Sequence, residues 1–430
     1  MSSLKILITG AGIAGTTLAY FLSQLPQSHS ITVLERSPIL RATGLQIDLR
    51  GPGIQVLRAM GLEEEFRAIS VPEQGLGLVD GKGRRWGYFP VKMGATGKGL
   101  QSFTTEWEVM RGDLTRMIYG ESFREGNVRY VFGVWVEGIQ EMGEGDGVEV
   151  VFSDGRKERF DLVIGADGLG SKTRGLMLGV DGDGRVGVHE LGVYAGYLTV
   201  KKEMKEGEGY DAMAYIATKG RGIMTRRHEK NRYLAYLFCR AEGGELQRGR
   251  KGDFEKEKQV LTKAFRGAGW QTEEILRGMD EADDFYCERM GVVNLDRWSR
   301  GRVVLVGDAA YCPSAMTGMG TSCAMTGAYV LAGEIGRVCG RGARVTKDDI
   351  ETALARYEEK MRPFMNHVQR GLLDNNDYMG KFPSSAFGVG VMYVLFAVVS
   401  FLRLDVLAKW VLREDTNGWE LPEYPELMRK

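Results

Sequence analysis

The chain has few residues of the types that build metal sites and disulfide frameworks. Its 430 residues include five cysteines and four histidines. The cysteines lack the paired spacing of metal sites, and an odd number argues against a disulfide framework. They are Cys239, Cys287, Cys312, Cys323 and Cys339. We therefore expect no bound metal, and we expect reduced thiols in an intracellular compartment.

An excess of charge of either sign is also absent. Lysine plus arginine and aspartate plus glutamate both number 57, so the formal net charge is zero. Proteins that bind nucleic acids usually carry a basic excess. Nucleic acid is therefore not an expected partner.

The chain has no apolar run of the length that a membrane span needs. Residues 386–402 are 17 residues without a charge, whereas a spanning helix needs about 20. A strand pattern already begins at Leu4, so we expect no targeting segment and a cytoplasmic location. Two interpretations of residues 386–412 stay open: helices packed on the protein body, or a surface for peripheral membrane contact or self-association.

The most informative feature that is present is a glycine-rich turn near the start. Residues 4–9 (LKILIT) have strand character, and residues 10–15 (GAGIAG) follow. Gly10 permits the tight turn, Gly12 lets a diphosphate approach the backbone, and Gly15 lets the next helix pack closely on the strand. Free amides at such a helix start bind anions. The predicted dinucleotide contacts are Gly10, Gly12, Ala14 and Gly15.

A carboxylate follows at the distance that such a site requires. A second strand is predicted over residues 30–34 and ends at Glu35, twenty residues beyond Gly15. Glu35 can accept hydrogen bonds from the adenosine ribose and would repel a 2′-phosphate. Arg36, beside it, is assigned to the same site.

Two later strands also end in glycine and aspartate. After a hairpin turn at residues 153–155, residues 159–164 run into Asp167 and Gly168; residues 302–306 run into Gly307 and Asp308. Asp308 can accept hydrogen bonds from a ribityl chain. The small residues of 314–328 let a helix begin beside a flavin pyrimidine, where its positive end would stabilise the reduced anion. In this order the segments indicate FAD rather than NAD, with Gly318 and Gly320 as further contacts.

Through these segments, the chain resembles the class A flavoprotein monooxygenases of the para-hydroxybenzoate hydroxylase-like superfamily. The resemblance covers residues 1–370 and is closest in style to the tetracycline-degrading and phenazine-modifying branch. Residues 41–49 (RATGLQIDL) resemble the loop beside the isoalloxazine, and residues 111–114 (RGDL) resemble a flavin-facing arginine at a helix start. The resemblance therefore adds Arg41, Asp48 and Arg111 to the cofactor contacts. It departs at Tyr311, where the family commonly has His, and at Gly327-Ala328, where it has Asp-Ala.

This resemblance implies an oxygen-inserting enzyme. NADPH or NADH would reduce FAD, O₂ would add to give a C4a-hydroperoxide, and one oxygen atom would pass to an aromatic or polyketide-like molecule. The protein's task would be placement and exclusion of water, so we assign no catalytic residue. Because no second strand–GxGxxG–helix unit exists, we expect the nicotinamide to bind transiently near residues 167–174. The flavin ring would then move between outer and inner positions beside the glycines of 41–53 and 313–320.

The predicted fold is α/β, with a Rossmann-like (GR2-type) FAD-binding domain, an inserted antiparallel β-sheet substrate domain and C-terminal helices. The flavin segments are far apart, so the flavin domain must be discontinuous. We expect its parts at 1–75, 106–186 and 286–370. The substrate domain is predicted at 76–105 and 187–285, and a helical region at 371–430.

Substrate contacts are assigned from side-chain type. Aromatic and methionine residues on the predicted substrate sheet are more often core than pocket, but some are candidates for lining the pocket. The candidates are Tyr194, Met213, Tyr215 and Met224, with Gln46 and Pro313 from the loops. Arg221 or Arg226 could pair with an acidic or phenolic substrate, although the ordinary role of such residues is a solvated surface.

Two other functions stay open. One is an FAD-dependent reductase or dehydrogenase that inserts no oxygen. The other is a flavin-fold binding or regulatory module, which the intact Glu35, Asp167 and Asp308 disfavour. Incorporation of label from ¹⁸O₂ separates the monooxygenase from the reductase.

Overall fold

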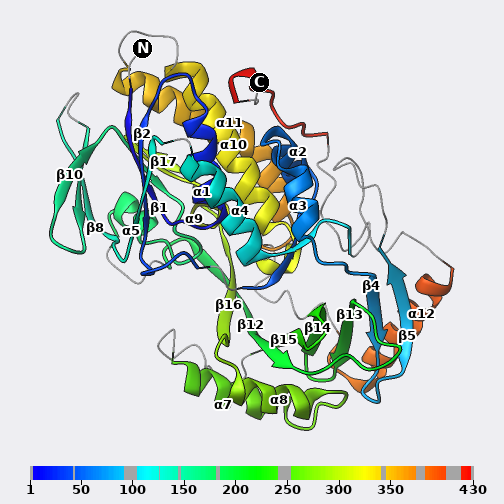
Figure 1. Cartoon of the computed structure of the whole chain (residues 1–430). Helices are drawn as coiled ribbons and strands as arrows, with labels where there is room; N and C mark the ends of the chain where they lie inside the picture. The colour runs from blue at the N-terminus through cyan, green and yellow to red at the C-terminus, as the bar shows by residue number, and fades with distance from the viewer. Residues whose placement is uncertain are drawn as a thin grey trace.

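A computed structural model describes the fold, over residues 3–41, 44–91, 104–124, 126–143, 147–180, 185–240, 253–339, 345–373, 383–402 and 418–427. Figure 1 shows a larger body, in which helices surround a sheet, and a smaller body built on a second sheet. The mixed α/β class predicted from the sequence is confirmed. The domain boundaries stay a prediction.

The larger body contains a six-stranded sheet with the order β17-β18-β11-β1-β2-β7. All neighbouring strands are parallel except β17, which is antiparallel to β18. The strands are β1 (Lys5–Thr9), β2 (Ser30–Glu35), β7 (Val128–Phe132), β11 (Leu162–Gly165), β17 (Ser299–Arg300) and β18 (Val303–Leu305). Because β18, β11 and β1 are parallel neighbours, the glycine-rich segments that follow them meet at one edge, where α/β proteins bind ligands.

Helices cover this sheet. Helix α1 contacts both α4 and α10, and α11 and α2 pack on α10. Residues 13–22 of α1 are all buried, which is the pattern of a helix enclosed by others. The helices are α1 (Ile13–Ser23), α2 (Pro52–Ala59), α3 (Glu63–Ile69), α4 (Arg111–Arg124), α5 (Lys172–Leu178), α9 (Asp308–Tyr311), α10 (Gly320–Cys339) and α11 (Lys347–Gln369).

The smaller body is a seven-stranded sheet with the order β16-β12-β15-β14-β13-β4-β5. Only β4 and β13 pair in parallel; the other pairs are antiparallel. The strands are β4 (Gly75–Val79), β5 (Arg85–Pro90), β12 (Val188–Lys201), β13 (Asp211–Ala217), β14 (Arg221–Glu229), β15 (Arg232–Arg240) and β16 (Tyr286–Val293). The expected boundary at residue 285 falls just before β16, so the sheet extends beyond it.

Two small sheets complete the fold. A three-stranded sheet contains β8 (Val136–Glu141), β9 (Val148–Phe152) and β10 (Lys157–Phe160), and β3 (Gln46–Asp48) pairs with β6 (Glu108–Met110). The single strand predicted over 159–164 is therefore wrong. It divides at Asp161, because β10 pairs with β9 whereas β11 joins the main sheet. The Asp161 carboxylate accepts a hydrogen bond from the Lys5 amide at 2.7 Å.

The two faces of the seven-stranded sheet have different neighbours. One face packs on α7 (Phe254–Phe265), α8 (Thr272–Glu281) and α12 (Ala386–Phe401). The other face carries Tyr197, Tyr236 and Met290 and contacts Leu45, Met110 and Met316 of the flavin segments. Because side chains alternate between faces, a residue's register decides which of these two environments it meets.

Helix α12 is the apolar segment singled out in the sequence. It lies along β5, where Ser400 Oγ accepts from the Tyr88 amide at 2.9 Å, and its Tyr393 hydroxyl donates to the Val79 carbonyl at the end of β4 at 2.7 Å. Its outer side exposes Phe387, Val394, Leu395 and Phe401, among others. Within the described part of the chain, no helix has both the length and the apolar character to cross a membrane. Residues 403–412 lie outside the described residues.

Candidate functional site

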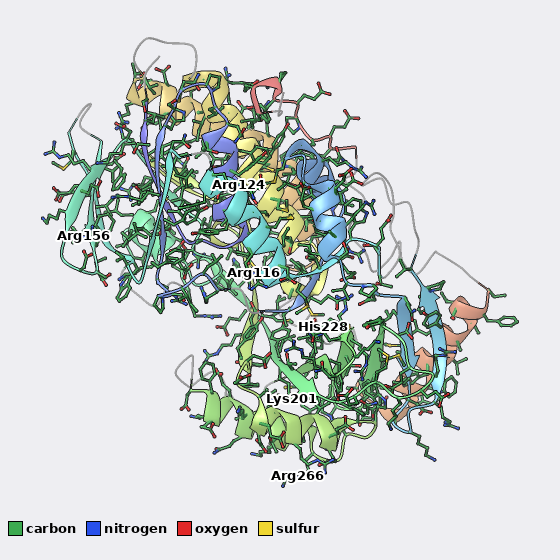
Figure 2. All side chains as sticks on the ribbon, viewed as in Figure 1. Arg116, Arg124, Arg156, Lys201, His228 and Arg266 are labelled. Atoms are coloured by element: carbon green, nitrogen blue, oxygen red, sulfur yellow. The ribbon has the colours of Figure 1, made fainter. Side chains whose placement is uncertain are left out.

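Burial separates two kinds of arginine in this protein. Arg116, Arg124, Arg156 and Arg266 lie on the outside, as Figure 2 shows. In contrast, Arg50, Arg174 and Arg226 are buried. A buried guanidinium requires partners, because desolvating an unpaired charge is costly. All three of these arginines have such partners.

The turn after β1 packs two glycines tightly and leaves one open. Gly10 has a φ of +98°, and a Cβ there would lie 2.6 Å from the Ala166 carbonyl oxygen. A Cβ on Gly15 would lie 2.0 Å from the Gly10 carbonyl oxygen. No atom lies within 4 Å of a Cβ built on Gly12. The open side of Gly12, at the start of α1, is therefore where a diphosphate can approach.

Glu35 lies at the end of β2 and is tied to this turn. Its Oε2 accepts a hydrogen bond from the Ala11 amide at 3.2 Å, and its Oε1 accepts from the Ser37 amide at 2.9 Å. The Arg41 guanidinium approaches Oε1 at 3.6 Å, while Arg36 is exposed. The structure thus brings Glu35 to the dinucleotide turn; the contacts of Arg36 and Arg41 with a cofactor stay predictions.

Asp167 organises the loop after β11. Its carboxylate accepts from the Thr173 amide and hydroxyl, both at 3.0 Å, and from the Ser171 hydroxyl. Ser171 in turn caps α5 by accepting from the Arg174 amide at 2.9 Å. Gly168 has a φ of +82°, and no atom lies within 4 Å of the place that a Cβ on it would take. The loop is therefore held by Asp167, and its contact with FAD or nicotinamide stays a prediction.

Arg174 joins two of the three glycine-rich segments. Its side chain donates to the carbonyls of Leu169 (2.7 Å), Val186 (2.7 Å) and Ala309 (3.0 Å). Ala309 belongs to α9, directly after Gly307-Asp308. Arg174 is fully buried, so its guanidinium fixes the strand ends relative to each other rather than facing a nicotinamide at the surface. Sequence reasoning did not find this role.

The third segment meets the first. Gly307 has a φ of +66°, and a Cβ on it would lie 2.9 Å from the Ala14 Cβ at the start of α1. Asp308 follows and is half-buried. Burial raises the pKa of Asp308, and the Arg111 guanidinium opposes that rise. Asp308 and Arg111, predicted from separate motifs, therefore lie close enough to interact.

Residues 44–48 pass directly beside Arg111. A Cβ on Gly44 would lie 3.4 Å from the Arg111 Cδ, and the Arg111 amide donates to the Leu45 carbonyl at 2.9 Å. Asp48 forms an ion pair with Arg50 and accepts from the Thr105 hydroxyl at 2.7 Å. Burial raises the pKa of Asp48 to about 7, against the opposing effect of Arg50. Asp48 thus holds the loop, and its predicted contact with FAD stays a prediction.

The start of α10 offers a second open strip. Gly318 (φ +66°) and Gly320 have no atom within 4 Å of an added Cβ. Pro313 is buried nearby, and Ser314 adopts a φ of 65° that is unusual for a residue with a side chain. Strained residues of this kind cluster at ligand sites. The positive end of a 20-residue helix therefore begins beside open glycine backbone.

The residues at this edge of the sheet fit FAD. The open backbone at Gly12 suits a diphosphate, the Glu35 carboxylate beside this turn could accept from an adenosine ribose, and Asp308 could accept from a ribityl hydroxyl. The open backbone at Gly318 and Gly320 leaves room beside a helix start. Within the described ranges, no group of His, Cys, Asp and Glu side chains could hold a metal ion.

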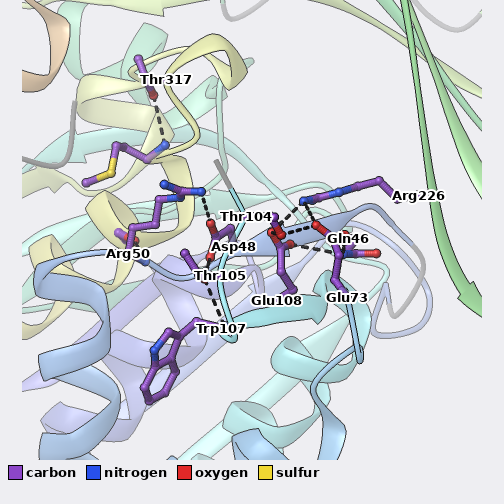
Figure 3. A network of polar contacts seen from close by, with 12 residues as sticks. Gln46, Asp48, Arg50, Glu73, Thr104, Thr105, Trp107, Glu108, Arg226 and Thr317 are labelled. Carbon is purple, nitrogen blue, oxygen red and sulfur yellow. Dashed lines mark hydrogen bonds and ion pairs between the residues drawn. The ribbon is translucent and has the colours of Figure 1, made fainter. Parts of the chain in front are cut away.

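A buried polar cluster lies between the two bodies, and no local sequence pattern indicates it (Figure 3). The Arg226 Nη2 donates to Oε1 of Glu73 (3.0 Å) and to Oε1 of Glu108 (2.7 Å). The Gln46 Nε2 donates to Oε2 of Glu73 (2.5 Å) and to Oε2 of Glu108 (3.3 Å). The Thr104 hydroxyl also donates to Glu73. The expected solvated role of Arg226 is therefore wrong, because strand register turns it inward.

The predicted substrate residues divide between the two faces of the seven-stranded sheet. Met224 packs with Tyr236 on the face toward the flavin segments. Tyr194, Met213 and Tyr215 pack on the opposite face against the outer helices, where the Tyr215 hydroxyl donates to the Ala268 carbonyl. We therefore keep Met224 and Gln46 as substrate candidates. The other three are corrected to core positions, because neighbouring registers face opposite sides.

The two departures from the family pattern, Tyr311 and Gly327, depend on each other because they pack together. The Tyr311 hydroxyl lies where a Cβ on Gly327 would be, 1.7 Å away. The Tyr357 hydroxyl lies 3.1 Å from both the Tyr311 hydroxyl and the Leu305 carbonyl oxygen. A larger residue at 327 requires a different one at 311. Cys312 and Cys323 are buried, and burial raises the pKa of both thiols, so they are core residues rather than reactive ones.

The fold and site thus define an FAD-dependent flavoprotein, and comparison with known proteins agrees. The FAD binding domain family matches residues 3–371, and the chain belongs to this family. An FAD-dependent monooxygenase of Sarocladium schorii is 42% identical over 438 residues, covering 100% of both chains. A flavin-dependent monooxygenase of a Phoma species is 40% identical over 441 residues, covering 99% of this chain and 98% of the relative.

A solved structure extends the comparison. The crystal structure of the tetracycline destructase Tet(55) has a TM-score of 0.76 at 27% identity, covering 99% of this chain and 100% of its own. The resemblance to class A flavoprotein monooxygenases is confirmed. The protein is a flavoprotein monooxygenase with FAD as its cofactor.

Proposed function

We propose that the protein consumes NADH or NADPH and inserts one oxygen atom from O₂ into an aromatic or polyketide-like small molecule. Bound FAD would supply the redox and oxygen chemistry. The residues of the chain would hold the substrate, exclude water and place positive charge near the flavin. An FAD-dependent reductase without oxygen insertion is the alternative that experiment must separate.

One observation carries the proposed substrate class. An apolar cluster joins the seven-stranded sheet to segments that are predicted to border the flavin: Leu45 lies in the loop 41–49, Met110 precedes Arg111, and Met316 lies two residues before Gly318. From the sheet, Tyr197 stacks on Tyr286 with ring centroids 4.7 Å apart. Aromatic rings favour such contacts with other rings, and methionines adapt to irregular shapes. A flat, largely apolar molecule suits this surface.

Gln46 supports a hydroxyl or amine on that molecule. Its Nε2 donates to two carboxyl groups, and its Oε1, an amide oxygen, is an acceptor. This oxygen is buried, and it has no donor among the residues that the structure describes. An unpaired buried acceptor is costly. A substrate donor would satisfy it. The solved neighbour is named as a tetracycline destructase, which is a precedent for a small-molecule substrate on this fold.

The flavin ring would also need room to move. Gly318 and Gly320 border open space, whereas a Cβ on Gly53 would lie 2.8 Å from Leu49 Cδ1 and Ser322 Oγ. Gly53 therefore serves packing, and the open glycines at α10 favour access to the flavin. We expect substrate binding to shift the balance between the outer and inner positions of the flavin ring.

The test is a substrate screen that follows NADH and NADPH consumption with mass spectrometry of products. A true substrate should raise the rate of nicotinamide oxidation at least about tenfold and yield a product heavier by one oxygen atom. Met224→Ala should raise KM for that substrate more than Tyr215→Phe does, since Tyr215 lies on the opposite face. Product formation without added oxygen would favour the reductase instead.

A further inference from the structure

The Glu73–Glu108–Arg226–Gln46 cluster has a feature that the proposed function does not use. Its two carboxyl groups face the same donors, because Arg226 Nη2 contacts Oε1 of both and Gln46 Nε2 contacts Oε2 of both. All four side chains are buried. Each donor is shared, so neither carboxyl group has a cation of its own.

The charges in the cluster do not balance if every acid is ionised. Glu73, Glu108 and Asp48 would carry three negative charges against two positive charges on Arg226 and Arg50. Asp48 and Arg50 form a separate ion pair, which leaves two glutamates for one arginine. Two buried carboxylates side by side cannot both ionise cheaply, so a pair of this kind retains a proton.

The cluster also spans the junction of the two bodies. Arg226 lies on β14 and Glu73 lies two residues before β4, and both strands belong to the seven-stranded sheet; Glu108 lies on β6 and Gln46 on β3, beside the flavin loop. The contacts therefore fix β3 relative to the sheet that carries Met224. A charge that appears in this cluster would therefore act on strand β3 and on the seven-stranded sheet at once.

We propose that Glu73 and Glu108 share one proton beneath Arg226, and that the resulting neutral unit positions Gln46 and strand β3 for oxygen transfer. Arg226 and the two acids are positioning residues. The shared proton stands on geometry and charge alone, whereas the effect on oxygen transfer rests on the proposed function.

The surroundings support this assignment. Burial raises the pKa of Glu73, with Arg226 opposing and Glu108 adding to the rise. The other described titratable groups that face the cluster are Asp48 and Arg50 from the β3 segment, Tyr236 from β15 and Tyr88 from β5. For an acid with a raised folded pKa, the stabilisation is full below the unfolded pKa and is lost as the pH rises through the folded value. Because the proposed proton is held at neutral pH, holoenzyme stability should fall as the pH rises above the ordinary glutamate range and continue to fall on the alkaline side.

Single and double substitutions distinguish a shared proton from two ionised acids. Glu73→Gln or Glu108→Gln mimics the protonated partner, so each should retain FAD, keep about half or more of the product formed per NAD(P)H, and lose the alkaline fall in thermal stability. The double variant leaves Arg226 without a carboxylate and should lower the yield of FAD-loaded protein at least about tenfold, as should Arg226→Met. Arg227→Met, on the opposite face of the same strand, should retain the alkaline fall.

Infrared difference spectra of the holoenzyme give a readout that needs no substrate. The wild type at neutral pH should show the carbonyl stretch of a protonated carboxyl group, and both single Gln variants should lack it. A wild-type spectrum without this band would overturn the shared proton. So would a band that only Asp48→Asn removes, because the proton would then belong to the Arg50 pair. Loss of the band at alkaline pH with an unchanged amount of product per NAD(P)H would overturn the positioning role while leaving the proposed function standing.

Discussion

Replacing Gly12 by alanine should separate FAD binding from folding. No atom lies within 4 Å of the added Cβ, and the Gly12 backbone (φ −79°, ψ −176°) is ordinary for any residue. The apoprotein should therefore be as stable as the wild type, or more stable by about 0.5 kcal/mol because the unfolded chain loses freedom. The methyl group occupies the side that the diphosphate must approach. The loss of one charged hydrogen bond is worth about 2 kcal/mol, or about thirtyfold in the Kd for FAD.

Gly15→Ala is the matched control. Its Cβ would lie 2.0 Å from the Gly10 carbonyl oxygen, so overpacking should destabilise the apoprotein itself by about 1–3 kcal/mol. The assays are thermal unfolding of apoprotein and titration with FAD, followed by flavin fluorescence. If Gly12→Ala binds FAD like the wild type, or unfolds as early as Gly15→Ala, the assignment of Gly12 to the diphosphate is refuted.

Three further predictions concern buried groups. Arg174→Lys cannot reach all three carbonyls that the guanidinium contacts; it should lose about 3 kcal/mol of stability with weaker FAD retention, and unchanged thermal unfolding would contradict its linking role. Gly327→Ala should be destabilised by about 2 kcal/mol and rescued in part by Tyr311→His, so a double-mutant cycle with no coupling would disprove the shared packing. Burial lowers the pKa of His29 to about 4. The neutral imidazole therefore contributes stability above pH 6.5 that is lost as the pH falls toward 4, and the loss is about 3 kcal/mol in all. Acid unfolding of His29→Gln that matches the wild type would refute this.

Local sequence chemistry is enough to predict that the three glycine-rich segments meet at one edge of the sheet. Turn glycines act through backbone geometry, and parallel strands bring their ends together, so the tight packing of Gly10 and Gly15 and the place of Asp308 at a strand end can be inferred without tertiary contacts; their contacts with FAD stay predictions. The predicted strand over 159–164 is divided at Asp161, because the strands on either side of this residue pair with different partners. Alternation of side chains along a strand cannot reveal which partner the strand has.

The substrate side cannot be predicted in the same way. Alternation shows that Met224 and Arg226 share a face, yet it does not say which face meets the flavin segments. The Arg226–Glu73 pair joins residues 153 positions apart, and Arg174 reaches Ala309 across 135 positions. Such contacts depend on how the two bodies dock, which no local pattern encodes. In the sequence, Tyr311 and Gly327 look like two separate departures from the family pattern. Only their packing in the structure shows that one depends on the other.

The central claim is oxygen insertion at an FAD site, and labelled O₂ tests it most directly. The holoenzyme, NADPH or NADH and a substrate identified by the screen should be incubated under ¹⁸O₂, and the product analysed by mass spectrometry. The account predicts one ¹⁸O atom in each product molecule, with FAD released on denaturation. A product that forms at full rate and carries no label from ¹⁸O₂ would contradict it.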